Sequence, residues 1–144
     1  MKIFIDADAC PVTDIAIKIA KENGIEVTLV CDFAHEMQRE GAKTVTVMRG
    51  ADSADFRLVN LLSPGDIVIT QDYGLAAMCM AKGARGLNQN GLEYTRENID
   101  GLLWQRHEAR KFRQSGGRTK GPSKRKEEQN QQFAAALRQL LAQR

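Results

Sequence analysis

Cysteine and histidine are scarce in this sequence of 144 residues, and their scarcity excludes two common kinds of small domain. The three cysteines, Cys10, Cys31 and Cys79, lie far apart and form neither a disulfide framework nor a zinc-binding spacing. We expect all three to be free thiols that are buried in the fold.

Long hydrophobic runs are also absent, since no apolar stretch approaches the roughly 20 residues that span a bilayer. The start of the chain, residues 1–6, becomes acidic too soon for a signal peptide. We therefore expect a cytoplasmic protein with no membrane partner. A hydrophobic content of 42% and a charged content of 27% are typical of one globular domain.

The small net charge of +3 hides an uneven distribution along the chain. Residues 105–144 contain eleven Lys and Arg against three Glu, which gives +8 and leaves −5 for residues 1–104. An acidic body with a basic end favours a polyanionic partner that meets the acidic part through a cation.

Short β-branched runs alternate with helical patterns along most of the chain. Runs that are apolar throughout are typical of parallel strands covered on both faces. The predicted fold class is α/β, with an open parallel sheet of four to five strands, flanking helices and a C-terminal helical extension. The predicted strands are 3–5, 27–30, 45–48, 67–69 and, more weakly, 85–87, and the predicted helices are 11–23, 53–62, 73–82, 96–114 and 127–143.

The pattern divides the chain into three segments. Residues 1–114 form the α/β domain, residues 115–126 are a flexible basic linker, and residues 127–144 form an amphipathic helix. The apolar face of this last helix must dock either on the body of the chain or on a second copy, as in a homo-oligomer.

Aspartates gather where the predicted strands end. Asp6 and Asp8 follow the first strand, Asp72 follows the fourth, and Asp52 and Asp55 begin the helix before it. If the first and fourth strands are neighbours, these residues converge where ligands bind in doubly wound sheets. Crowded carboxylates repel one another unless a cation neutralises them, and oxygen ligands favour Mg²⁺ or Mn²⁺.

Simpler roles remain open for several of these residues. Asp52 and Asp55 have the spacing of a helix capping box, and Asp72 can cap the helix that follows it. Asp66 opens a strand at the opposite edge, so a surface position is expected. The pair Asp6 and Asp8 is the hardest to explain structurally, because two carboxylates after a buried strand lose hydration without helping the fold.

Arginines form the second candidate site. Arg106, Arg110 and Arg113 recur at helical spacing and form one basic stripe. Together with Arg118 and Lys120 of the linker, they are predicted to contact the phosphates of a nucleic acid, with RNA the expected partner.

Four motifs make the chain resemble the YaiI/YqxD family of bacterial proteins, which has a PIN-like fold. The resemblance extends over nearly the full length and is carried by IDADACP at 5–11, GADSAD at 50–55, DIVITQDYGLA at 66–76 and GGRTKGP at 116–122.

The resemblance implies that residues 1–114 are a PIN-like domain. PIN-like proteins are typically Mg²⁺- or Mn²⁺-dependent ribonucleases with acidic residues at positions matching Asp6, Asp55 and Asp72. Asp8 would add a fourth catalytic and metal-binding carboxylate, and Asp52 a further metal ligand. The sequence departs from the PIN pattern at an earlier helix, where only Glu22 or Glu36 could replace the usual glutamate.

Three functions are therefore compared. The leading hypothesis is a metal-dependent nuclease or phosphodiesterase acting on RNA. A haloacid-dehalogenase-like phosphatase would use Asp6 as nucleophile and Asp8 as acid, but that family expects threonine or valine at Cys10. A non-catalytic RNA-binding module would need only the basic end of the chain.

Overall fold

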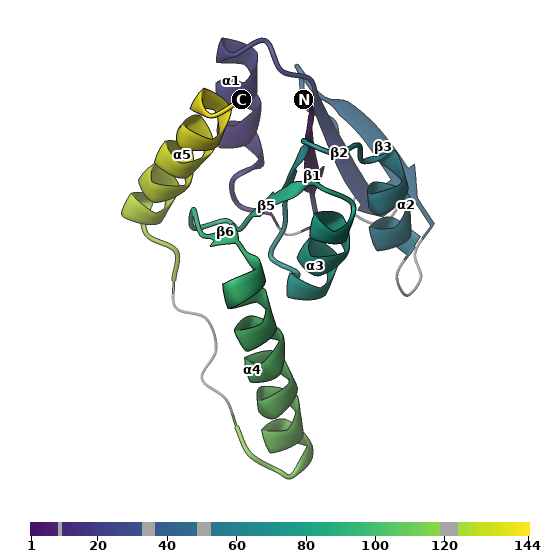
Figure 1. Cartoon of the computed structure of the whole chain (residues 1–144), viewed down its shortest axis with the longest axis vertical. Helices are drawn as coiled ribbons and strands as arrows, with labels where there is room; N and C mark the ends of the chain where they lie inside the picture. The colour runs from purple at the N-terminus through teal and green to yellow at the C-terminus, as the bar shows by residue number, and fades with distance from the viewer. Residues whose placement is uncertain (9, 33–36, 49–52, 119–123) are drawn as a thin grey trace.

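A central sheet with helices on both faces organises the computed structural model, which describes residues 1–8, 10–32, 37–48, 53–118 and 124–144. Figure 1 shows α1 and α5 beside the sheet on one face and α2 and α3 on the other. The elements in chain order are β1 (Ile3–Asp6), α1 (Thr13–Glu22), β2 (Val27–Asp32), β3 (Lys43–Val47), α2 (Ser53–Leu61), β4 (Ile67–Ile69), α3 (Tyr73–Ala81), β5 (Arg85–Leu87), β6 (Glu93–Tyr94), α4 (Arg96–Gln114) and α5 (Glu127–Ala142).

The strands follow the order β3-β2-β1-β4-β5-β6. β1 pairs in parallel with β2 on one side and with β4 on the other, and the parallel pairs extend outward to β3 and β5. Strand order reverses between β1 and β4, so this is the point where an open α/β sheet forms a ligand-binding crevice.

The sheet differs from the prediction at one edge. Within the described residues it has six strands rather than four to five, because Glu93 and Tyr94 form a two-residue strand. This strand pairs antiparallel with β5, placing Tyr94 opposite Gly86. A segment of two residues is too short to show the alternating hydrophobic pattern of a strand, so it could not be predicted from the sequence and is defined only by its hydrogen bonds to β5.

Side chains alternate between the two faces of β1, as the period of a strand requires. Ile3 and Ile5 pack in the core beneath α1 and α5, whereas Phe4 packs in the core beneath α2 and α3. Ala7 continues the first series, because it belongs to the same core as Ile5. Asp6 consequently lies on the side of α2 and α3.

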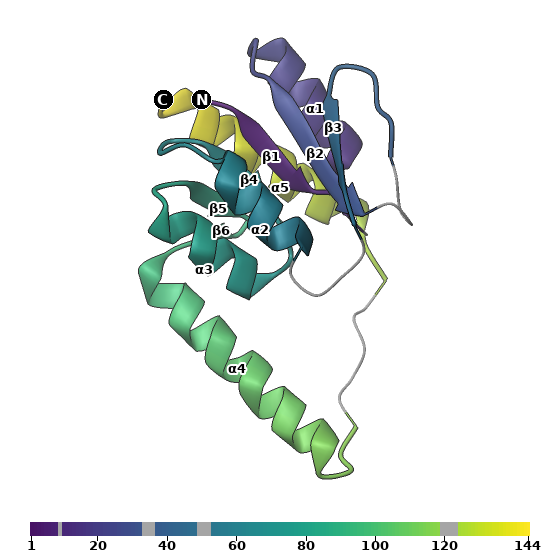
Figure 2. The same cartoon turned by 90° about the vertical axis from the view of Figure 1, so that its right-hand side faces the viewer.

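The two C-terminal helices behave differently. α5 buries Phe133, Leu137, Leu140 and Leu141 in the same core as β1 and α1, so it docks on its own chain. α4 packs against α3 only near its start, through Ile99, Leu102 and Leu103. Its remaining turns extend past the edge of the sheet where β1 and β4 end (Figure 2).

Asp66 corrects a second prediction, because it is buried and not on the surface. Its carboxylate accepts hydrogen bonds from the backbone N–H groups of Lys2, at 2.9 Å, and Ser63, at 2.8 Å. The carboxylate thus ties the start of β1 to the loop before β4, which gives a buried charge its compensating donors. None of the helices in the described part of the chain is long and apolar enough to cross a membrane.

Candidate functional site

The carboxyl ends of β1 and β4 are joined by one threonine. Ile5 pairs with Ile69, so the next residues, Asp6 and Thr70, leave the sheet side by side. The Thr70 hydroxyl donates a hydrogen bond to Oδ2 of Asp6 at 2.9 Å and accepts one from the backbone N–H of Asp72 at 3.0 Å. Thr70 therefore fixes the two aspartates relative to each other.

Asp6 has a strongly perturbed carboxyl group. Burial, which is the largest cause, and the charges of neighbouring aspartates raise its pKa from 3.8 to about 6, although the hydrogen bond from Thr70 acts in the opposite direction. Among these aspartates, Asp55 has the largest effect on the pKa of Asp6, followed by Asp8 and then Asp72. Four carboxylates from β1, α2 and the β4–α3 turn thus interact electrostatically; we call Asp6, Asp8, Asp55 and Asp72 the acidic cluster.

The thiol of Cys79, which feels the charges of this cluster, is held protonated. Burial, and then the charges of Asp55 and Asp6, raise the pKa of Cys79 to about 12. Cys31 and Cys79 are buried as predicted, whereas Cys10 is only partly buried, although burial still raises the pKa of its thiol. All three cysteines are free, and a protonated thiol is a poor nucleophile or metal ligand. The chemistry of the site is therefore carried by carboxylates.

Asp72 has two partners at once. Its Oδ1 accepts a hydrogen bond from the backbone N–H of Leu75 at 3.2 Å, so Asp72 is the N-cap of α3, as its simpler role predicts. The same oxygen lies 3.3 Å from Nη1 of Arg106 in α4. This ion pair is partly exposed and contributes little to stability, but it brings a guanidinium into the acidic cluster.

An open cavity of 450 Å³ exposes the cluster to solvent. Its lining includes four residues that the sequence predicted for a site, Asp6, Asp8, Asp72 and Arg106, but not Asp55. Sequence reasoning missed four polar residues of this region: Gln71 and Tyr73, which line the cavity, Thr70, and Tyr94, whose hydroxyl donates to the Thr70 carbonyl at 2.9 Å. The register of β1 against β4 would have identified Thr70.

The donor chemistry of the acidic cluster fits a hard divalent cation. Carboxylate oxygens are the ligands that Mg²⁺ and Mn²⁺ prefer, and a cation would relieve the repulsion that raises the pKa of Asp6. Among the described residues, no three Asp, Glu, His or Cys side chains already lie close enough to hold a metal ion. Asp52, the fifth predicted ligand, lies outside the described residues.

The predicted phosphate contacts fall on two segments. Arg106 reaches the acidic cluster, and Arg110 and Arg113 are exposed further along the same face of α4. Arg118 is exposed just after the helix, and Lys120 lies outside the described residues.

The glutamate that PIN-like proteins carry on an earlier helix has no counterpart placed at the site. Glu22, at the end of α1, forms an ion pair with Arg138 of α5 at 3.6 Å. Its role is therefore to join two helices on the opposite face of the sheet. Glu36 lies outside the described residues.

Comparison with known proteins gives consistent matches over nearly the whole chain. The model of a family described as "Uncharacterized BCR, YaiI/YqxD family" matches residues 4–143. A UPF0178 protein of Exiguobacterium sibiricum is 49% identical over 144 residues, covering 100% of this chain and 99% of the relative. A UPF0178 protein of Ruminiclostridium cellulolyticum is 50% identical over 137 residues, which cover 95% of this chain and 90% of the relative. No solved structure matches this chain.

Proposed function

The chain belongs to the YaiI/YqxD family, and from this premise we propose that it is a divalent-metal-dependent nuclease that cleaves RNA. The observation that carries the proposal is the acidic cluster at the switch point between β1 and β4. Its central carboxyl, Asp6, has a pKa raised to about 6 by burial and by three neighbouring aspartates. Such perturbed groups in a cleft are typical of catalytic sites.

Asp6, Asp8, Asp55 and Asp72 are the residues that would hold the metal. When bound, the ion would supply Lewis-acid stabilisation of a phosphate and lower the pKa of water. Thr70 keeps Asp6 in place through its hydroxyl. The Arg106 guanidinium, beside the cluster, is positioned to bind a phosphate oxygen of the substrate.

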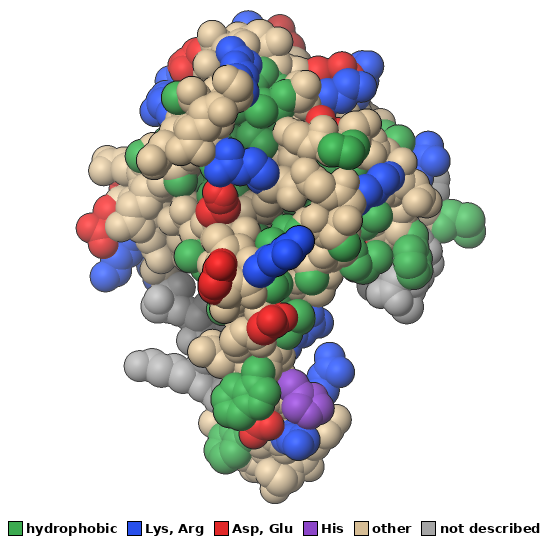
Figure 3. Space-filling model, viewed as in Figure 1, with side chains coloured by type: hydrophobic (Ala, Val, Ile, Leu, Met, Phe, Trp, Pro, Cys, Tyr) green, Lys and Arg blue, Asp and Glu red, His purple; other side chains and the backbone are tan. Residues whose placement is uncertain are grey.

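α4 supplies a surface for the rest of an RNA strand. The basic stripe starts at the acidic cluster with Arg106 and continues with Arg110 and Arg113 beyond the sheet. Figure 3 shows exposed hydrophobic side chains on this part of α4, where Trp104 and Phe112 are 64% and 52% exposed. With about 3.6 residues per turn, these two rings lie on a different face of α4 from the basic stripe, so the stripe alone carries the proposed phosphate contacts.

The test is cleavage of single-stranded RNA by the purified protein with Mg²⁺ or Mn²⁺. Asp6→Asn removes the central ligand and is expected to abolish metal-dependent cleavage while the circular dichroism spectrum stays native. Asp100→Asn is the matched control, because Asp100 is an exposed aspartate on α4 outside the cluster. If wild-type protein cleaves no RNA with either metal, the proposed activity is wrong.

A non-catalytic RNA-binding module is the second candidate. It is favoured by the ion pair of Asp72 with Arg106, which neutralises one carboxylate without a metal. In that case RNA binding would weaken as the salt concentration rises and would persist in the Asp6→Asn variant. The bound RNA would not be cleaved.

A further inference from the structure

A second cavity lies at the other end of the interface between α3 and α4. It has a volume of 580 Å³, and none of its lining residues lines the cavity of the acidic cluster. Leu102 and Leu103 pack against the α3 side between the two. We propose that this second cavity binds a nucleoside monophosphate, independently of the proposed nuclease activity.

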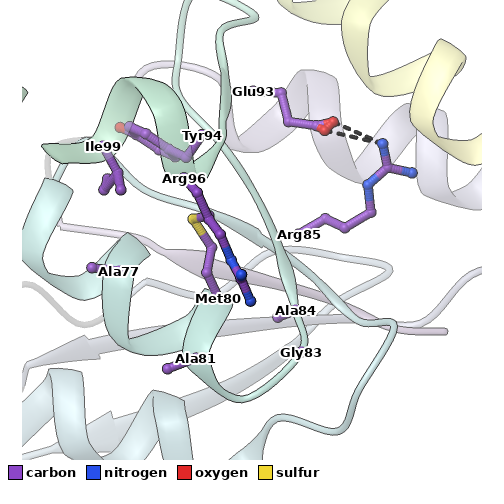
Figure 4. Close-up of a pocket in the computed structure, with 10 residues that line it drawn as sticks. All are labelled: Ala77, Met80, Ala81, Gly83, Ala84, Arg85, Glu93, Tyr94, Arg96 and Ile99. Atoms are coloured by element: carbon purple, nitrogen blue, oxygen red, sulfur yellow. Dashed lines mark hydrogen bonds and ion pairs between the residues drawn. The ribbon is translucent and has the colours of Figure 1, made fainter. Parts of the chain in front are cut away.

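The floor of the cavity suits a flat ring. Ala77 and Ala81 of α3 and Gly83 and Ala84 of the turn into β5 have small side chains or none, so they leave a shallow apolar surface (Figure 4). Met80 adds a polarisable thioether, which makes favourable contacts with aromatic rings. A volume of this size lies within the usual range for sites of small ligands, about 300–1,000 Å³.

Arg96 provides a cation for the phosphate of such a ligand. Figure 4 shows its side chain extending from the start of α4 across the cavity toward Met80 and Ala84. Among the described residues, its guanidinium has no hydrogen-bond or ion-pair partner. A guanidinium stacks on aromatic faces and binds phosphate oxygens, so Arg96 can cover a ring or hold its phosphate.

Arg85 and Glu93 also line the cavity, but their charged ends lie on the α5 face of the sheet, where they pair with each other (Figure 4). Nη2 of Arg85 donates to both carboxylate oxygens of Glu93, at 2.7 and 3.0 Å, and to Oε1 of Gln143 at 3.1 Å. The charges of Arg85 and Glu93 cancel in this ion pair, so Arg96 is the residue whose charge complements a phosphate in the cavity.

Isothermal titration calorimetry with the four ribonucleoside 5′-monophosphates, and with ribose 5-phosphate, tests this proposal on the full chain. At least one nucleotide is expected to bind. Ribose 5-phosphate is expected to bind at least about tenfold more weakly, because it lacks the aromatic base. Arg96→Ala is expected to weaken nucleotide binding at least about tenfold. Ala81→Trp, which fills the floor from an exposed helix position, is expected to abolish it.

Arg57→Ala is the matched control, because it removes an exposed arginine from α2. Its nucleotide affinity should equal that of the wild type. Amide chemical shifts should move at Gly83 and Ala84 and stay unchanged at Asp6. The proposal is wrong if no nucleotide binds at millimolar concentration or if ribose 5-phosphate binds equally well. It is also wrong if Arg96→Ala leaves the nucleotide affinity unchanged, or if the chemical-shift changes are confined to the acidic cluster.

Discussion

Asp6 and Asp66 lie at opposite ends of two neighbouring strands, and their environments have opposite energetic consequences. Asp66 accepts two backbone N–H groups, which stabilise its carboxylate in a buried position. Asp6 is buried beside other carboxylates, and its pKa is raised to about 6. The charge of Asp66 therefore supports the fold, whereas the charge of Asp6 opposes it. A residue that opposes the fold is typical of a functional site.

Asp6→Asn is expected to raise the free energy of unfolding at neutral pH by about 1–3 kcal/mol. The pKa of Asp6 is higher in the folded state, about 6, than its ordinary value of 3.8. The folded protein therefore binds more protons between these values, and wild-type stability falls as pH rises through them. The gain from Asp6→Asn should be largest above about pH 6 and vanish near pH 4, as measured by urea unfolding across this range.

Asp66→Asn is the matched comparison and should lower the free energy of unfolding by about 1–3 kcal/mol, because its NH₂ group would face a backbone donor. Equal losses in both variants would show that Asp6 is a structural residue and contradict its assignment to the site.

At the scale of elements, α5 packs so closely on the β5–β6 loop that only glycine fits at Gly91. Gly91 has φ of +88°, and a Cβ there would lie 2.7 Å from the carbonyl oxygen of Gln132. Arg125, just before α5, secures the same loop through bonds of 2.7 Å to Asn90 Oδ1 and the Gln89 carbonyl. The position of the C-terminal helix is thus set by close backbone packing as well as by its apolar face.

Gly91→Ala should lower the free energy of unfolding by about 3 kcal/mol or more, through backbone strain and the clash with α5. Gly24→Ala should cost only about 1–2 kcal/mol, because Gly24 has φ of +66° but no atom within 4 Å of the added Cβ. Urea unfolding of both variants measures the difference. Equal losses would contradict the close approach of α5 to the loop.

α4 gives a second prediction at this scale, which concerns the proposed RNA surface. Arg110→Ala with Arg113→Ala should weaken binding of single-stranded RNA and reduce the dependence of log K on log salt by about 1.4, since two phosphate contacts are lost. Lys18→Ala with Lys21→Ala removes two charges from exposed positions of α1 and should leave both unchanged. Fluorescence anisotropy at several salt concentrations measures affinity and slope. Equal effects of the two double variants would indicate non-specific attraction.

At the scale of the whole molecule, an acidic body and a basic C-terminal part meet at the pair of Asp72 and Arg106. The chain carries −5 in residues 1–104 and +8 in residues 105–144. A divalent ion in the acidic cluster would reduce the repulsion among its carboxylates. It would also make the net charge of residues 1–104 less negative, which favours binding of a polyanion. The proposed metal therefore affects the stability of the molecule as well as its activity.

Mn²⁺ is expected to raise the melting temperature by about 5 °C at saturating concentration and neutral pH, since ligands that bind only the folded state stabilise it. The shift should decrease as pH falls below about 6, because protons then compete for Asp6. Differential scanning fluorimetry measures it. Asp6→Asn should remove the shift and Asp100→Asn should retain it; no shift in the wild type would argue against a metal site.

The sequence by itself determined which segments are strands and helices. Strands 67–69 and 85–87 and helix 96–114 have the predicted bounds, because β-branched runs, turn residues and caps act within a few residues. It also identified which carboxylates follow the strands. The number of strands was wrong, since β6 depends on an antiparallel partner and has no pattern of its own.

Only the tertiary structure decided which of these residues meet. The pairing of β1 with β4 places Thr70 between Asp6 and Asp72, and the packing of α4 on α3 brings Arg106 to the same carboxylate. Packing on β1 and α1, in place of a second copy, likewise fixes the position of α5. Local patterns specify the direction and face of a side chain, whereas contacts between distant segments follow from strand order and helix packing, which no short stretch of sequence encodes.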